Sequence, residues 1–389
     1  MVTMMPFLNP NGAIALAKDR LGGLLLIACC LFAFLWATFH PSSYSAFKHY
    51  PLAEGISWQL FVNDLLMVLF FFMVGLELSN ETKHGVFRTK RAIVLPLLSA
   101  CAGFICPAII YLFLIGGFAS PLSSGWAIVT ATDIALALGL LSLCSRAPVS
   151  LKMFLLAVAI FDDLLAIITI ALFYTTSFEV LYLCLSVGIT VLMFWLTRWQ
   201  TKRLSPYLAL GAILWFVLLK AGIHPVLAGV VIGFAVSQSG CAFSRRNESV
   251  LQWTVTLLVL PLFALSNAGV SLAGIFSLES VIDPIAAYIA IAMLIGKPLG
   301  VFGSVWLGVR LKIFELPEAT NLRMLFALSI FCSIGLTLSL FIGELSGLAN
   351  DHYKLGIVVA ALVASILGLI CMHFATRHGA DVLQVGGDQ

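Results

Sequence analysis

The chain has 389 residues, of which 61% are hydrophobic and 10% charged, whereas soluble domains are about 45–50% apolar and about 25% charged. A mean hydropathy of +1.08 excludes a soluble globular protein and leaves no room for a separate water-soluble domain. The net charge is only +3, and the 21 Lys and Arg residues are scattered rather than clustered as nucleic-acid binding requires. The composition therefore predicts one integral membrane domain over residues 1–389, surrounded by lipid, with neither nucleic acid nor a cofactor.

Apolar segments long enough to cross a bilayer follow one another along the whole chain. A spanning helix needs about 20 mostly apolar residues, and Pro, Gly and charged clusters mark the breaks. The predicted fold class is an all-α polytopic membrane protein with about twelve transmembrane helices. In chain order they are 21–39, 58–80, 92–116, 123–143, 150–174, 180–198, 205–219, 223–237, 250–271, 284–309, 325–347 and 355–376. The short pair 205–219 and 223–237 could instead be one kinked helix, which would lower the count.

Lys and Arg are distributed very unevenly between the two sides of the predicted membrane domain. Alternate connections on one side carry 17 of the 21 basic residues, and the other side carries Lys48 and Lys354. Cytoplasmic loops are enriched in Lys and Arg. We therefore expect both termini in the cytoplasm, as tails over residues 1–20 and 377–389.

Four charged residues lie at the middle of predicted spans. Asp162 and Asp163 are each roughly 18 Å from either end of their helix, and Asp133 and Lys297 are equally central in theirs. A charge at the bilayer centre costs about 2.5–3.5 kcal/mol or more, so each is a candidate functional residue. One carboxylate and Lys297 could form a purely structural ion pair, but three carboxylates cannot all be neutralised by one lysine.

The adjacent aspartates are suited to exchanging a cation for a proton. Two carboxylates that share a low-dielectric site repel each other, so the pair is expected to hold protons near neutral pH. Alkali cations also prefer oxygen ligands, and no His or Cys constellation suited to a transition metal accompanies the pair. Na⁺ or Li⁺ and H⁺ would then compete for Asp162 and Asp163. That competition produces antiport if the site opens to one side at a time.

Two spans carry signs of interruption at mid-depth. Thr130 to Asp133 places two hydroxyls and a carboxylate in the fourth span, and Ser333 to Gly335 lies at the centre of the eleventh. Small residues of this kind also occur in ordinary helix packing. The two spans are an odd number apart, so helices 3–5 and 10–12 would have opposite topologies, as in inverted repeats with broken helices. Asp133 and Lys297 would then compensate the partial charges of the facing half-helix ends.

Several motifs together resemble the NhaA-type sodium/proton antiporters. They are Ala157 to Leu164 (AVAIFDDL), Thr130 to Ala135 (TATDIA), Ile295 to Gly300 (IGKPLG), Pro261 to Ala264 (PLFA) with Asn267 to Val270 (NAGV), and Phe71 to Glu77 (FFMVGLE). The similarity runs in order from about residue 10 to 376. It implies a multi-pass protein of the bacterial inner membrane that expels Na⁺ or Li⁺ and imports more than one H⁺. The family is itself one of the known inverted-repeat folds, with helices 4 and 11 broken and crossed.

The resemblance also implies roles for individual residues. Asp162 and Asp163, with Thr132, match the cation and proton ligands of the family. Lys297 matches the lysine that pairs with Asp162 when no sodium is bound. Asp133 matches the residue that compensates the helix crossing, which lies at Thr130, Ser333 and Gly335.

A second set of residues matches the family's pH-response region. These candidates are Asp64, Glu77, Glu81, His224 and Glu248. The chain departs from the family pattern at Asn80, where an arginine is usual, and at Ser249, Gln252, Ser333 and Leu336. These departures leave the ion site intact but put the pH-activation profile in doubt. Glu77, Glu81 and Glu248 could also be simple solvated helix ends.

Two further features lie near the predicted outer side. The loop from Lys48 to Trp58 could form the hairpin through which family members dimerise, so a homodimer is expected. Glu344 matches no family residue and is interpreted as a membrane-interface position.

Three other classes of function fit the sequence less well than antiport. An intramembrane aspartyl protease would need aspartates on separate helices and a Gly-x-Gly-Asp sequence, and the chain has consecutive aspartates and no such sequence, so we do not expect an enzyme. A channel fits a titratable pair and a lysine at mid-depth less well than alternating access does. A sodium-coupled symporter of a related crossed-helix fold would need a cavity for an organic substrate, and it stays open as the alternative.

Overall fold

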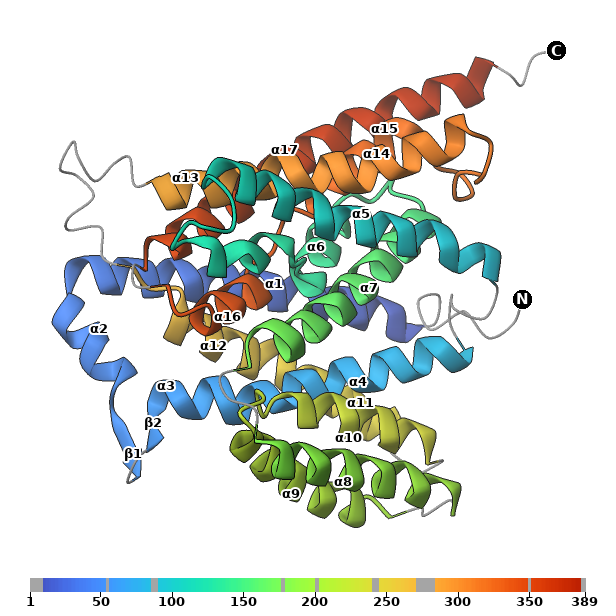
Figure 1. Ribbon diagram of the computed structural model, residues 1–389. Coiled ribbons are helices and arrows are strands. Elements are labelled where there is room, and N and C mark those ends of the chain that lie inside the picture. Colours follow the sequence, from blue (N-terminus) through green and yellow to red (C-terminus); the bar gives the residue numbers. More distant parts are fainter. Residues whose placement is uncertain are drawn as a thin grey trace.

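The computed structural model is almost entirely helical (Figure 1). It describes residues 10–53, 56–84, 90–175, 179–199, 203–239, 245–270, 284–348 and 351–385, with the side chains of 10–20, 81–82, 84, 90–92, 245–246 and 378–385 left out. The predicted tails therefore lie partly outside the described residues. Helix α1 begins at Pro10, well before the predicted first span, and α17 continues to Val385.

The helices have the following bounds. The long ones are α1 Pro10–Phe39, α4 Met67–His84, α5 Lys90–Leu114, α7 Val149–Phe173, α8 Val180–Arg198, α9 Ser205–Ala221, α14 Lys297–Arg310 and α17 His352–Val385. The shorter ones are α2 Pro41–Lys48, α3 Trp58–Leu60, α6 Ile134–Leu141, α10 Leu227–Gln238, α11 Arg245–Thr254, α12 Leu260–Asn267, α13 Pro284–Ile291, α15 Leu322–Phe331 and α16 Thr337–Leu345. Wider π-helical turns form η1 Phe61–Leu66, η4 Val255–Val259 and η5 Ala292–Gly296, and η3 Ser123–Thr130 is a 3₁₀ helix.

The prediction of a polytopic, helical membrane protein is confirmed. Among the described residues, nine helical segments are long and apolar enough to cross a membrane. Three shorter apolar helices accompany them, namely α9, α10 and α15. The segment that could have been one kinked helix is two helices, because α9 ends at Gly222 in a left-handed conformation with φ of 77°.

The two strands form a small hairpin outside the helices. Strands β1 Pro51–Ala53 and β2 Ile56–Ser57 are antiparallel. They lie within the predicted dimerisation loop and project from the end of the molecule that also carries α2 (Figure 1).

Small residues allow two pairs of helices to approach closely. A side chain on Gly233 of α10 would lie 2.2 Å from the Phe72 carbonyl oxygen of α4. A side chain on Gly300 of α14 would lie 2.2 Å from the Ala102 carbonyl oxygen of α5, and Gly296 meets Pro107 of α5 in the same way. Without a hydrophobic force between helices in lipid, this close backbone contact is a main source of association. It brings Lys297, which lies between Gly296 and Gly300, into the centre of the molecule.

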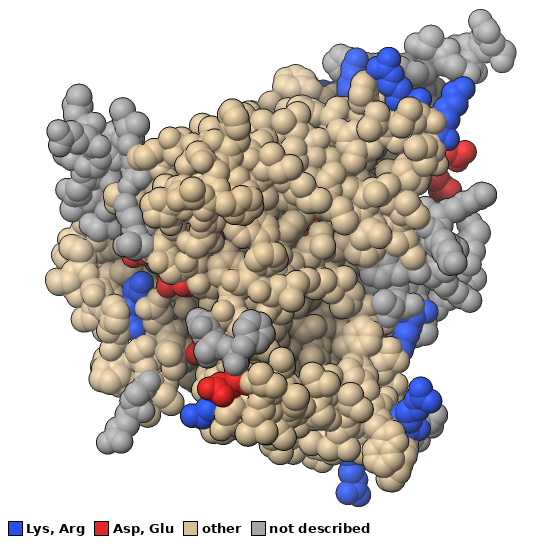
Figure 2. Space-filling model, viewed as in Figure 1, with Lys and Arg blue, Asp and Glu red and all other residues tan. Residues whose placement is uncertain are grey.

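The charged residues mark two ends separated by an uncharged band. The start of α1 and the end of α17 lie at the same end (Figure 1). Most of the Lys and Arg residues visible in Figure 2 also lie at that end, and the middle of the visible surface is uncharged. We call this the terminal end, and the end with α2 and the hairpin the opposite end.

Candidate cation-binding site

The two interrupted segments meet in the interior. Helix η3 ends at Thr130 and α6 begins at Ile134, while α15 ends at Phe331 and α16 begins at Thr337. The Asp133 backbone N–H donates to the Ile334 carbonyl oxygen at 2.6 Å. The extended residues between the half-helices thus hydrogen-bond to each other. Helix ends leave unsatisfied N–H and C=O groups, and these ends are buried, so the contact brings partial charges into the interior.

The Asp133 carboxylate satisfies the beginnings of two half-helices. One oxygen accepts from the Leu136 backbone N–H at 3.1 Å, which caps α6. The other accepts from the Thr337 hydroxyl at 2.8 Å and from the Thr337 backbone N–H at 3.3 Å, at the start of α16. Helix N-termini carry partial positive charge, so one buried carboxylate stabilises both.

Lys297, Asp162 and Thr132 form a compact buried group. The Lys297 Nζ lies 2.5 Å from Asp162 Oδ2 and 2.9 Å from Thr132 Oγ1. The Thr132 hydroxyl lies 2.6 Å from the same Asp162 oxygen. Lys297 and Asp162 are fully buried. The structure thus brings together one residue from each of three elements: α14, α7 and the break before α6.

Other oxygens at this place have no partner. Asp162 Oδ1, Asp163 Oδ1 and Ser333 Oγ are buried and make no hydrogen bond to any described residue. Buried polar atoms are normally paired, and an exception at a site needs a cause. An oxygen set of this kind can bind a proton or a small hard cation.

The pH-response candidates fall into separate places rather than one cluster. His224 Nε2 lies 3.5 Å from Asp64 Oδ1, and its ring contacts Phe341 edge-on at 5.1 Å between centroids. Glu248 accepts instead from Asn80, at 2.8 Å. Asp64 and Asn80 are 16 residues apart, or about 24 Å along the helix. Glu77 is half-buried on α4, and the Glu81 side chain lies outside the described residues.

Lys83 sits near the same end as Asn80. Its ammonium group donates to the Ser237 carbonyl oxygen at 2.6 Å, and the Ser237 hydroxyl donates to Asn80 at 3.1 Å. Partial burial lowers the pKa of Lys83, because desolvation disfavours the charged form. Lys83 thus supplies a positive charge to this region, whereas position 80 contributes only a neutral amide.

Sequence reasoning missed one group at the opposite end. Lys354 is fully buried and lies 2.6 Å from Glu344, although both were assigned to the membrane interface or a loop. The available signal was weak: Lys354 stands at the start of an apolar run, where a lysine usually extends its amine to water.

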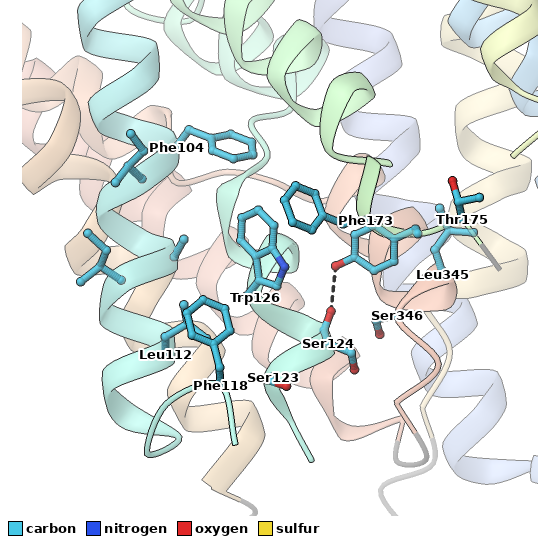
Figure 3. Close-up of a pocket in the computed structure, with 14 residues that line it drawn as sticks. Phe104, Leu112, Phe118, Ser123, Ser124, Trp126, Phe173, Thr175, Leu345 and Ser346 are labelled. Carbon is cyan, nitrogen blue, oxygen red and sulfur yellow. Dashed lines mark hydrogen bonds between the residues drawn. The ribbon is translucent and has the colours of Figure 1, made fainter. Parts of the chain in front are cut away.

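One sizeable cavity lies apart from the buried carboxylates. It has a volume of about 740 Å³ and is walled by aromatic and aliphatic side chains, including Phe104, Trp126 and Phe173 (Figure 3). Phe173 is ten residues beyond Asp163 on α7, about 15 Å along the axis. No Asp, Glu, Lys or Arg is among the residues that line this cavity.

A polytopic helical protein with a buried lysine, unpartnered carboxylate oxygens and two interrupted helices in contact has the features of a secondary ion transporter. Comparison with known families agrees with this class. The family model described as Na⁺/H⁺ antiporter 1 matches residues 14–372. The chain therefore belongs to this antiporter family.

Individual relatives are similar over most of their length. The chain is 41% identical over 378 residues to the Na⁺/H⁺ antiporter NhaA of Proteus mirabilis, covering 92% of this chain and 95% of the relative. It is 40% identical over 370 residues to the NhaA of Vibrio campbellii, covering 92% and 93%. The NhaA of Aeromonas hydrophila is 39% identical over 378 residues, covering 92% and 95%. These relatives and the confirmed helical architecture indicate a multi-pass protein of the bacterial inner membrane.

Proposed function

We propose that the protein is an electrogenic Na⁺(Li⁺)/H⁺ antiporter that exports Na⁺ in exchange for more than one H⁺ by alternating access, and so regulates intracellular pH and sodium. The observation that carries this proposal is the set of unpartnered oxygens on Asp162 and Asp163 beside the Lys297 ion pair. A cation and protons can use the same oxygens, but not at the same time. Family membership agrees with this exchange.

The proposed architecture has twelve spans. The nine long segments, α9, α10 and the α15–α16 pair together make twelve. Helices 3–5 and 10–12 would form the inverted repeat, with broken helices 4 and 11 crossing at Thr130, Ser333 and Gly335. The hydrogen bond between Asp133 and Ile334 supports that crossing. The basic residues at the terminal end support a cytoplasmic location for both tails.

Within the site, Asp163 and Asp162 would bind the cation or protons, with Thr132 as an additional oxygen ligand. A cation on the free Asp162 Oδ1 would compete with the Lys297 ammonium on Oδ2 for the charge of the same carboxylate. Lys297 then either releases its proton or only moves aside. Asp133 would hold the half-helix ends in place without binding the transported ion.

The remaining expectations are part of the same proposal. The β1–β2 hairpin is exposed, as a homodimer contact would require. The outer surface of the helices is apolar and suits lipid. Asp64, Glu77, Glu81, His224 and Glu248 would adjust activity with pH, although Asn80 supplies no charge where the family has one.

The symporter alternative has less support. It needs an enclosed polar cavity next to the cation site. The 740 Å³ cavity is mostly apolar, and Phe173, the residue of α7 that lines it, lies about 15 Å beyond Asp163 along that helix.

The deciding experiment is cation-induced proton release from the purified protein in detergent, measured from mildly acidic to alkaline pH. Addition of Na⁺ or Li⁺ should release protons from the wild-type protein and none from Asp163→Asn. Asp351→Asn is a matched carboxylate-to-amide control at an exposed position and should behave as the wild type. Equal release from Asp163→Asn and wild type would refute the assignment.

A vesicle experiment tests whether the exchange moves net charge. Protein reconstituted with a K⁺ gradient and valinomycin should exchange faster when the compartment that receives protons is made negative. A rate independent of the imposed potential would contradict a stoichiometry above one H⁺ per Na⁺.

A further inference from the structure

A second buried lysine lies at the opposite end of the molecule. The Lys354 side chain, in the first turn of α17, is completely buried, and its Nζ lies 2.6 Å from Glu344 Oε1 and 2.9 Å from Asp351 Oδ1. Glu344 is in the last turn of α16. The lysine therefore ties the end of α16 to the beginning of α17.

The other oxygen of Glu344 reaches a different part of the molecule. The Gln59 side-chain amide, on α3, donates to Glu344 Oε2 at 3.1 Å and lies 3.4 Å from Asn267 Oδ1 on α12. The Asn267 amide donates in turn to Asn63 of η1 at 2.8 Å. We call Lys354, Glu344, Gln59, Asn267 and Asn63 the outer bridge.

The outer bridge joins two groups of helices, which also contact each other directly where α12 packs on α16. On one side, α16 packs on η3 and α17, and α17 packs on α13 and α15. On the other side, α3 continues into η1 and α4, and η1 packs on α12. Helix α16 also begins at Thr337, which holds Asp133 at the break. One short helix thus has the candidate ion site at its beginning and the outer bridge at its end.

An aromatic cluster closes the space between the bridge and the break. The Phe341 ring, on α16, lies 5.8 Å from the Phe71 ring and 6.1 Å from the Phe263 ring between centroids. Phe341, Phe71 and Phe263 are all buried. Opening the face of α16 that carries Phe341 means parting these rings, and parting them separates α16 from α4 and α12.

We propose that the Glu344–Gln59 contact is an outer gate, which holds the opposite end closed and must break each time the ion site opens to that side. The gate rests on the proposed alternating access. Lys354 holds Glu344 on the α16–α17 side through their 2.6 Å contact, so Gln59 is the partner that leaves. Asp351 binds the same lysine but lies on the same side of the contact, so it takes no part in opening.

The partial exposure of Glu344 allows its contact with Gln59 to open. Glu344 is 21% exposed and can reach water as soon as Gln59 withdraws. The contact is therefore able to open repeatedly without leaving a buried charge unpaired. A salt bridge buried on both sides could not open so readily.

Hydrogen exchange tests the gate without requiring transport. Gln59→Leu removes the bridging amide and should speed backbone exchange in residues 337–345 by about tenfold, the loss of one hydrogen bond to a charged group. Gln59→Glu, which places a second carboxylate against Glu344, should speed it at least as much. Asp351→Asn should leave exchange in 337–345 as in the wild type. Unchanged exchange in both Gln59 variants would overturn the gate.

A cross-link tests whether the contact must open during turnover. In a protein without its native cysteines, Gln59→Cys and Glu344→Cys are joined by a short, reducible bifunctional thiol reagent, and Na⁺/H⁺ exchange is measured in vesicles. Exchange should stop on cross-linking and return on reduction. The control pair Asp351→Cys and Glu344→Cys carries the same Glu344 change, and its exchange rate should be the same before and after joining. Full exchange with the Gln59 pair joined would refute the gate, whereas absence of Na⁺/H⁺ exchange in the wild-type protein would refute the proposed function.

Discussion

The centre of the molecule and its opposite end each contain a fully buried lysine beside carboxylates, but the two groups differ in how completely their oxygens are paired. At the centre, Lys297 contacts one Asp162 oxygen, and the other Asp162 oxygen and Asp163 Oδ1 have no partner among the described residues. At the opposite end, both Glu344 oxygens are occupied, by Lys354 and by Gln59.

This difference separates a binding site from a structural contact. Unpaired buried oxygens are costly in low dielectric and are relieved by a proton or a cation. Fully paired oxygens gain nothing from a further ligand and instead hold their elements together. The same residue types therefore serve two purposes, and the hydrogen-bond partners decide which.

The largest expected effect comes from removing the central lysine. Lys297→Met leaves Asp162 buried with only Thr132, and breaking a buried pair in this way costs about 3–5 kcal/mol. The midpoint of thermal unfolding in detergent should fall accordingly. Adding Asp162→Asn should restore most of the loss, because the uncompensated charge is then gone. Additive losses in the double variant would show that the two residues do not interact as the structure indicates.

Removing the lysine of the outer bridge should cost less. Lys354→Met leaves Glu344 and Asp351, but their side chains are 21% and 59% exposed and can be solvated. The expected loss is about 1–3 kcal/mol, measured by the same thermal unfolding. A loss as large as that of Lys297→Met would contradict the distinction between the two groups.

Much of the central group could be predicted from the sequence because charges stand out against an apolar background. Asp162, Asp163, Asp133 and Lys297 are the charged residues at mid-span, and insertion cost alone selects them. The pairing of Lys297 with Asp162 rather than another carboxylate was available only through the family resemblance. Composition and spacing do not fix which of three carboxylates a lysine reaches.

The opposite end could not be predicted in the same way. Glu344 and Lys354 lie near span ends, where a charge is ordinarily solvated, so nothing in the pattern distinguishes a buried pair from two surface residues. The contact with Gln59 joins residues 285 positions apart, and it depends on how α3 and α16 pack. The predicted first span, 21–39, matches the candidate membrane span Leu21–Phe39, and α1 continues before it to Pro10.

Replacing Asp133 tests whether its carboxylate stabilises the crossing of the two interrupted helices, and the expected loss of stability is moderate. Asp133→Ala removes the cap of α6 and the contacts with Thr337, and should lower stability by about 1–2 kcal/mol. Asp133→Asn retains a capping oxygen and should recover part of that loss, but not the charge that faces two helix N-termini. Thermal unfolding of both variants separates the two contributions. Equal stability of the alanine and asparagine variants would show that the carboxylate does not cap α6.

The smallest expected effect concerns Asn80 and Glu248 near the terminal end. Asn80→Ala removes one half-buried hydrogen bond to a carboxylate, and the loss should be about 1 kcal/mol or less. Asn80→Arg would replace this neutral donor with a cation, as the family pattern has it.

A cation at position 80 turns the contact with Glu248 into an ion pair. Added salt weakens the attraction between partly exposed charges, because the screening length is only about 10 Å at 0.1 M salt. The unfolding midpoint of Asn80→Arg should therefore fall more steeply with added inert salt than that of the wild type. Glu248→Gln in the same background should abolish that extra salt dependence, because the charge on the partner is gone. An equal salt response of the arginine variant and the wild type would contradict the contact between position 80 and Glu248.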